Sequence, residues 1–331
     1  MLVTPSQFVE QYMQQGAAAA NDLDRLVSQP SGLNAAGMIA AISDPRLGRL
    51  GIPMMADFMA PQESIYFDAI FGAYYGQHAI RAWLVPAMAE IEFIDFVPTA
   101  ESVIFDDGLG DSSLDEWEMV ANIGADKIPL SRGVSVRRYR NGFISWACDV
   151  YDTGAFRQPP PPEVAGSAPE IPPWPRVEWV VDDTVADAPL SDAALAWIGS
   201  RASAALADSP GLSHQDLHHL VTNRETATDI ELLGRLFHPT DSVYFDPLLG
   251  ELRGQAKIRD RFERHANTFG THRREPLGPP LFDGETSVHE WQRLSNHADG
   301  SAVTIRGTSV RRFADGWLSY AAEYFDTAPL V

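Results

Sequence analysis

Two tyrosine–aspartate pairs in this chain have the spacing of an acid/base site. Tyr244 and Asp246 stand two residues apart, and Tyr66 and Asp68 form the same pair earlier in the sequence. Residues i and i+2 of a strand point to one face, so each tyrosine is expected beside its carboxylate. A carboxylate among apolar side chains has a raised pKa and can act as a general base, while a tyrosine can donate to a developing oxyanion. The pairs therefore predict proton-transfer chemistry.

Two further carboxylates and two arginines are candidates for the same sites. Glu323 and Asp149 each alternate with an alanine and an aromatic residue on a predicted strand, and Arg311 and Arg137 lie on the strand before. On the catalytic interpretation the carboxylate is a base and the arginine supplies a fixed positive charge. The structural alternative is that Tyr-x-Asp caps a turn, and that each carboxylate pairs with its arginine across the hairpin.

One histidine and three tryptophans are candidates for contact with a substrate. His289 lies on a predicted strand, Trp291 and Trp117 each follow a glutamate, and Trp317 follows a predicted turn. The recurring Glu-Trp dipeptide also fits a shared packing role. No pair of histidines has convincing metal-ligand spacing with a carboxylate, so we expect no metal.

The candidates recur because much of the chain is present twice. Nine of the nineteen positions in 63–81 are identical in 241–259, and ten of the twenty-one in 133–153 are identical in 307–327. A period this long, present twice, indicates a duplicated domain and not a solenoid.

Both copies have the same order of predicted elements: helices, one strand, a helix, then antiparallel strands. Asn141-Gly142 and Asp315-Gly316 predict the turns of the last hairpins. This order is typical of an α+β fold. Eight prolines between Pro159 and Pro175 predict an extended, fairly stiff segment. We predict a first domain over 1–153, a proline-rich linker over 154–190 and a second domain over 191–331.

Composition limits the classes of partner. A formal net charge of −20 argues against nucleic acid, which needs a basic surface, and against an anionic membrane. The single cysteine, Cys148, excludes a disulfide framework. No stretch reaches the roughly 18 apolar residues of a membrane span, and the N-terminus lacks the pattern of a signal peptide. We expect a cytoplasmic protein.

The repeated segments resemble a known family. The stretch 244–254 is similar to the first strand of the SnoaL-like proteins, and 312–326 to their last hairpin. These proteins belong to the nuclear-transport-factor-2-like superfamily, with ketosteroid isomerases, limonene-type epoxide hydrolases, scytalone dehydratase and polyketide cyclases. The resemblance covers about 130 residues of each copy. It implies two tandem cone-shaped α+β barrels of the cystatin-like type, each a curved antiparallel sheet wrapped by helices around an apolar pocket, and enzymes that mostly use no cofactor.

The resemblance also implies roles for individual residues. Asp246 falls where the ketosteroid isomerases keep their general base, and Tyr244 with Asp246 falls where the epoxide hydrolases keep a Tyr-x-Asn pair. Glu323 falls on the last-strand carboxylate that those hydrolases use as base. Ser309 stands where both groups place a further catalytic Asp, which argues against plain versions of either reaction. The first-copy equivalents are Asp68, Tyr66, Asp149 and Ser135.

We therefore expect a cofactor-free lyase that acts on a hydrophobic, aromatic or polycyclic small molecule, as in the catabolism of aromatic compounds. Dehydration or retro-aldol elimination fits best, because it needs one base, one donor and no activated water. The alternatives are an isomerase, cyclase or epoxide hydrolase of the same superfamily, or a non-catalytic binding or interaction module. The two domains are expected to imitate the homodimer of the family within one chain, and further homo-oligomers are possible. The second copy is the favoured main site.

Overall fold

A computed structural model describes the chain as two compact units, which divide between Asp149 and Val150 among the described residues. Each unit has its own helices and its own sheet. Of the predicted linker, only 154, 189 and 190 are described, so its ends remain predictions. The described residues are 4–69, 71–91, 93–154, 189–200, 210–223, 229–248, 250–269, 274–296 and 302–327.

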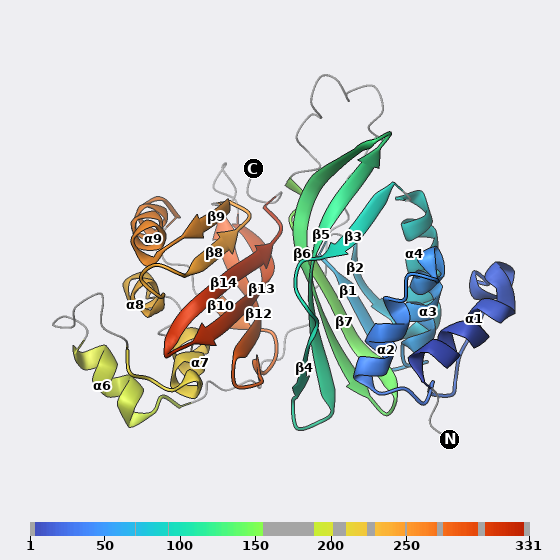
Figure 1. Cartoon of the computed structure of the whole chain (residues 1–331), viewed down its shortest axis with the longest axis horizontal. Helices are drawn as coiled ribbons and strands as arrows, with labels where there is room; N and C mark the ends of the chain where they lie inside the picture. Colours follow the sequence, from blue (N-terminus) through green and yellow to red (C-terminus); the bar gives the residue numbers. More distant parts are fainter. Residues whose placement is uncertain are drawn as a thin grey trace. The chain divides into compact units, whose positions relative to one another are not determined.

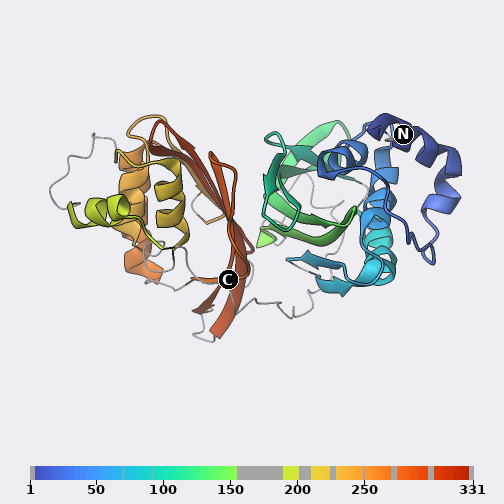
Figure 2. The same ribbon diagram turned by 90° about the horizontal axis from the view of Figure 1, so that it is seen from below.

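Helices begin the first unit and return after its first two strands. Side chains complete two of the helix starts: Thr4 accepts from the backbone of Gln7 in a capping box, and Asn34 accepts from Gly37. In both views the helices gather on one face of the first sheet (Figures 1 and 2). The helices are α1 (Pro5–Ala20), α2 (Ala35–Ile42), the 3-10 turn η1 (Gly48–Leu50), α3 (Gly51–Phe58) and α4 (Gly76–Glu90).

The first sheet has the strand order β2-β1-β7-β6-β5-β3, with β4 beside β5. β1 runs parallel to β7, whereas β1 with β2, and β5 with β3, β4 and β6, are antiparallel. The strands are β1 (Ile65–Asp68), β2 (Gly72–Tyr75), β3 (Ile94–Pro98), β4 (Val103–Asp106), β5 (Asp111–Ile123), β6 (Asp126–Arg140) and β7 (Phe143–Tyr151).

The second sheet repeats this order, strand for strand, as β10-β12-β13-β14-β8-β9 with β11 beside β12, and β8 is parallel to β14. Two sheets of identical order fit the predicted duplication. The helices of this unit are α6 (Asp192–Ser200), α7 (His214–Thr222), α8 (Ile230–Leu236) and α9 (Gln255–Phe269). Its strands are β8 (Val243–Asp246), β9 (Gly250–Arg253), β10 (Arg274–Pro276), β11 (Leu281–Phe282), β12 (Thr286–Asn296), β13 (Ala302–Ala314) and β14 (Trp317–Phe325).

Both predicted hairpin turns are confirmed. Asn141 and Gly142 have φ angles of 54° and 78°, and Asp315 and Gly316 have 52° and 75°. Positive φ at both central residues matches the twist of the flanking strands. In contrast, only one strand was predicted before the last helix of each copy, whereas a second strand, β2 or β9, follows it in the structure.

The side of each sheet that faces the helices is called its inner face here. In the first unit Tyr66 pairs with Ala147, and both pack in one cluster with helix residues such as Ile80. In the second, Tyr244 and Ala321 pair and pack with Leu236 and Ile258 of α8 and α9. Since alternate residues of a strand share a face, the predicted carboxylates two residues further along also lie on the inner faces.

The repeated glutamine at the start of the fourth helix of each copy has a structural role. The side-chain amide of Gln77 donates to the carbonyl of Met59 over 2.7 Å, and its oxygen accepts from the backbone of Val27 over 2.6 Å. Gln255 donates to the carbonyl of Phe237 over 2.5 Å. Each glutamine ties a helix start to the end of the preceding helix, so its recurrence reflects the fold.

A repeated glycine makes room for a tryptophan. Trp291 lies opposite Gly307 in the β12·β13 register, and a Cβ at Gly307 would stand 2.3 Å from the indole ring. Trp117 and Gly133 repeat the arrangement, with 2.2 Å to the ring. Any side chain at these glycines would displace the indole. The pairs therefore support the packing interpretation of the Glu-Trp dipeptides.

Candidate functional site

Four polar side chains cross the inner face of the second sheet in one row. His289 on β12 pairs with Ser309 on β13, which pairs with Glu323 on β14. The parallel β14·β8 register pairs Ala322 with Phe245, so Asp246, the next residue of β8, lies at the level of Glu323. All four are buried, with exposed fractions of 6%, 3%, 2% and 5% in that order. Buried polar groups side by side on a face lined with apolar residues mark a candidate site.

Glu323 is held by two arginines and a serine. Nη1 of Arg274 lies 3.1 and 3.0 Å from Oε1 and Oε2, Ser309 donates to Oε2 over 2.6 Å, and Nη2 of Arg311 donates to Oε1. Burial alone would raise the pKa of this carboxyl group, but the charges of Arg274 and Arg311 and the Ser309 hydrogen bond lower it to about 2. Glu323 is therefore ionised and a poor base at neutral pH, which favours the structural pair over the predicted base.

Arg311 is committed to the same structural role. Its Nη1 donates to the carbonyls of Val310 and Ala322, both over 3.1 Å, while Nη2 bonds Glu323. The arginine predicted to stabilise a substrate thus secures a carboxylate and the backbone of two strands.

Asp246 accepts two hydrogen bonds from neutral donors. The hydroxyl of Tyr244 donates to Oδ2 over 2.8 Å, and the amide of Leu248 donates to Oδ1 over the same distance. Burial, followed by the nearby charges of Asp246 and Glu323, raises the pKa of Tyr244 well above its usual value, so the hydroxyl stays protonated. The predicted proximity is present, but Tyr244 donates to the carboxylate itself and orients it.

His289 lies at the other end of the row as a neutral ring. Burial, then the charges of Arg274 and Arg311, lower the pKa of His289 to about 3. A neutral imidazole keeps one N–H donor and one acceptor at neutral pH, so His289 can bind a substrate oxygen but is not a cation there.

Sequence reasoning missed Arg274, which is the first residue of β10. Its guanidinium lies 4.5 Å from the centroid of the Trp291 ring and 3.2 Å, through Nη1, from Ser309. Trp291 in turn donates its indole N–H to Ser309 over 2.8 Å. Arg274 is 49 residues from Glu323 in the sequence and stands on a three-residue strand. A strand that short has no periodicity to identify its inward side chain.

The first unit uses the same positions differently. Tyr66 donates to Oδ2 of Asp149, while Oδ1 of Asp149 is buried and has no hydrogen-bond partner among the described residues. Asp68 pairs with Asp149 in the β1·β7 register and accepts from the backbone of Phe71 over 3.0 Å. Its tyrosine therefore bonds the last-strand carboxylate, whereas Tyr244 bonds the first-strand one.

The structural alternative paired Arg137 with Asp149 across the hairpin. In the structure Arg137 pairs with Asp115 instead. Nη1 of Arg137 lies 2.5 Å from Oδ2 of Asp115, and Trp117 donates to Ser135 over 2.9 Å. Burial lowers the pKa of Arg137, but the charges of Asp115 and Asp149 raise it above its usual value, so it remains a cation. Asp115 was missed, although it precedes Glu-Trp just as His289 does, which the repeat alignment could have revealed.

The structure does not bring Trp317 to these carboxylates. A bulge between Arg312 and Phe313 shifts the β13·β14 register, and Leu318, not Trp317, packs in the inner cluster. Trp317 instead lies edge-on to His238, with ring centroids 5.7 Å apart. The alternation used to place it does not continue through the bulge.

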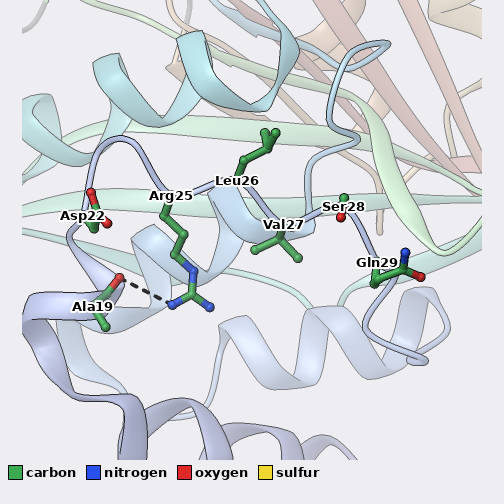
Figure 3. A pocket seen from close by; sticks show the side chains of 7 residues that line it. All are labelled: Ala19, Asp22, Arg25, Leu26, Val27, Ser28 and Gln29. Atoms are coloured by element: carbon green, nitrogen blue, oxygen red, sulfur yellow. Dashed lines mark hydrogen bonds between the residues drawn. The ribbon is translucent and has the colours of Figure 1, made fainter.

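An open hollow of about 570 Å³ lies in the first unit, away from these groups. Ala19, Arg25, Val27 and neighbouring residues of the segment after α1 line it, as Figure 3 shows. Arg25 donates to the carbonyl of Ala19 and forms an ion pair with Asp57 at 3.2 Å. The hollow presents no cluster of reacting groups. Within the described ranges, no set of three His, Cys, Asp or Glu side chains is placed to hold a metal ion, and no helix has the length and hydropathy for a membrane span.

Comparison with known proteins agrees with this architecture. The fold is α+β, with two curved sheets that each carry helices on one face. The family model of the SnoaL-like domain matches residues 217–320. The match covers less than half of the chain and lies in its second unit, which therefore contains a SnoaL-like domain. None of the curated proteins matches the sequence.

Several solved structures align with part of the chain. An NTF2-like protein of unknown function from Burkholderia pseudomallei is 20% identical over 42% of this chain and 94% of its own, with a TM-score of 0.28. A protein with a ketosteroid isomerase-like fold from Catenulispora acidiphila is 12% identical over 43% and 91%, with a TM-score of 0.29. A cystatin-like protein from Xanthomonas campestris is 17% identical over 34% and 91%, with a TM-score of 0.30.

Proposed function

We propose that the protein is a cofactor-free acid/base lyase for a hydrophobic, aromatic or polycyclic small molecule, with Asp149 as the clearest general base. The observation that carries the proposal is the unpartnered, buried Oδ1 of Asp149 on the inner face of the first sheet. A buried polar atom without a partner needs an explanation, and a catalytic role is one that its neighbours support.

Those neighbours supply what a base needs. Tyr66 donates to Oδ2 and holds the carboxylate in one orientation, which leaves the lone pairs of Oδ1 to accept a proton. Arg137 remains cationic on the same face and can stabilise negative charge that develops on a substrate oxygen. In the second unit Asp246 is the corresponding candidate, because Glu323 is held as a weak base by two arginines.

The proposed reaction begins at a carbon next to a carbonyl group. Asp149 removes a proton from that carbon, and the electron pair moves to the carbonyl oxygen to give an enolate, which faces the charge of Arg137. The enolate then re-forms the carbonyl and expels hydroxide from the neighbouring carbon. The protonated Asp149 returns its proton to the hydroxide, so that water leaves and a conjugated enone remains.

Proton exchange tests the first step without the natural substrate. In D2O the protein should accelerate deuterium incorporation into 2-tetralone, followed by NMR. Asp149→Asn preserves shape and removes the base, so the rate should fall about 100-fold or more, and Tyr66→Phe should cost about ten- to a hundred-fold. Asp95→Asn, an exposed residue of the same sheet, is the matched control and should exchange like the wild type.

The second unit is measured in the same way. Asp246→Asn and Asp68→Asn show how much each first-strand carboxylate contributes to the exchange rate. The double variant Asp149→Asn/Asp246→Asn should lose exchange altogether. If the wild type does not accelerate exchange, or the double variant exchanges normally, the proposal is wrong and a binding module remains. Dehydration of a β-hydroxy ketone fused to an aromatic ring then separates a lyase from an isomerase or cyclase, which would exchange protons without forming an enone.

A further inference from the structure

Arg293 is a cation with no acidic partner at ion-pair distance in the described part of the chain. It lies on β12 directly opposite Arg274 on β10. Its guanidinium lies 5.7 Å from the centroid of the Trp291 ring and 5.3 Å from that of Phe325, and its buried Nε has no hydrogen-bond partner. Like charges opposite each other destabilise a sheet, and a buried polar atom without a partner is costly. Apart from these two ring contacts, the described residues give the charge of Arg293 no counter-charge.

The inner face of the second sheet carries more positive than negative charge at this point. Among the described residues, three arginines, Arg274, Arg293 and Arg311, stand with two carboxylates, Glu323 and Asp246. The chain as a whole has a formal net charge of −20, so a local surplus of cations runs against its composition. Burial and then the charge of Arg274 lower the pKa of Arg293 to about 10, which still leaves it protonated at neutral pH.

The first unit shows that this pair is not required for the sheet. In each unit a proline lies opposite the tryptophan, Pro98 opposite Trp117 and Pro276 opposite Trp291. Two residues beyond, where the second unit has Arg274 opposite Arg293, the first has Phe96 opposite Met119. Phe96 packs against its tryptophan edge-on at 5.2 Å, so an apolar pair builds the same register.

We propose that Arg293, with Arg274 beside it, binds the carboxylate of an aromatic organic acid on the inner face of the second unit. A guanidinium matches a planar carboxylate through two parallel hydrogen bonds, and such an anion would neutralise the surplus charge. Only Nη1 of Arg274 bonds Glu323 and Ser309, so its Nε and Nη2 remain for the ligand within the described contacts. Phe325 and the apolar residues of the inner face would receive the rings.

Isothermal titration with 2-naphthoate tests the site. The wild type should bind 2-naphthoate. It should bind 2-naphthamide, which has the same rings without the charge, at least tenfold more weakly. Arg293→Met removes the charge as in the first unit and should weaken naphthoate binding by tenfold or more, with the amide unchanged. Arg293→Lys should retain part of the affinity. The control Arg264→Met removes an exposed arginine of α9 that pairs with Asp260, and should leave binding unchanged.

Two readouts keep the outcome unambiguous. Because Arg293→Met removes a like-charge contact, its unfolding midpoint should equal or exceed that of the wild type, so lost binding would not reflect misfolding. 2-Naphthyl phosphate distinguishes a carboxylate site from a phosphate site. Equal binding of acid and amide, no binding of either, tighter binding of the phosphate, or full affinity in Arg293→Met would each overturn the proposal. Asp149→Asn should bind naphthoate normally, which separates this site from the proposed reaction.

Discussion

Replacing Glu323 by glutamine tests the buried ion-pair cluster of the second unit. The carboxylate accepts from Arg274 with both oxygens, from Arg311 and from Ser309. An amide keeps one acceptor oxygen but presents an NH2 group to donors, and it leaves two guanidinium groups without their counter-charge. Removing one partner of a buried pair costs about 3–5 kcal/mol, so Glu323→Gln should destabilise the second unit by that amount at neutral pH.

The lowered pKa of Glu323 makes the stability from the same contacts depend on pH. This pKa is lowered from 4.5 to about 2 in the folded protein, and each unit of difference corresponds to about 1.4 kcal/mol, so the linkage is worth about 3 kcal/mol. Because the folded pKa lies below the unfolded one, this stability is fully present above pH 4.5. It is lost as the pH falls from 4.5 through 2, when the unfolded chain takes up the proton first.

The assay is denaturant unfolding at pH 7 and at steps down to pH 2, followed by hydrogen-exchange mass spectrometry of peptides from β12 to β14. These peptides report the second unit alone. Asp260→Asn breaks an exposed pair on α9 and is the matched control, with an expected change below about 0.5 kcal/mol. If Glu323→Gln stays within about 1 kcal/mol of the wild type and keeps the same slope between pH 4.5 and 2, the cluster does not stabilise the fold as argued.

Three further perturbations have defined outcomes. Gly307→Ala should lower the free energy of unfolding by about 1–3 kcal/mol, because the new Cβ meets the Trp291 ring. At Gly199 a new Cβ meets no atom, so Gly199→Ala should leave the free energy of unfolding unchanged or raise it by up to about 1 kcal/mol. Thermal unfolding compares the two variants. Gln77→Ala should cost about 3 kcal/mol in denaturant unfolding, since it leaves buried backbone groups unpaired, and a loss under about 1 kcal/mol would contradict its role. Burial lowers the pKa of His218 to about 4. The neutral ring therefore contributes stability that is fully present above pH 6.5 and is lost as the pH falls through 4. In His218→Phe the free energy of unfolding should not show this change between pH 6.5 and 4.

The fold was predictable because the sequence contains two copies of the same domain pattern. The repeat anchors and the Asn-Gly and Asp-Gly turns are local signals, and both turns have their expected structure. The strands that sequence reasoning missed, β2, β3, β9, β10 and β11, have two to five residues. Strands this short form because a neighbouring strand pairs with them, and alternation cannot identify them.

The candidate site was predictable in its residue types and faces, but not in its partners. Strand parity placed Tyr66 with Asp68 and Tyr244 with Asp246, and the registers add Asp149 opposite Asp68 and Ala321 opposite Tyr244. It could not tell that Tyr66 bonds Asp149 while Tyr244 bonds Asp246, because that choice depends on which carboxylate the arginines already hold. Partners that come from distant strands depend on how the sheet is assembled, and a repeat period contains no such information.

The proline opposite each tryptophan gives the two sheets a common reference position. Phe96→Arg with Met119→Arg would place in the first unit the pair that the second already has, at sites whose backbone pairing is the same. Side chains at such equivalent sites can diverge in one copy while the other stays unchanged. One polypeptide can then carry two ligand preferences, and since both halves are translated together, the cell receives them in a fixed one-to-one ratio that separate genes would have to regulate.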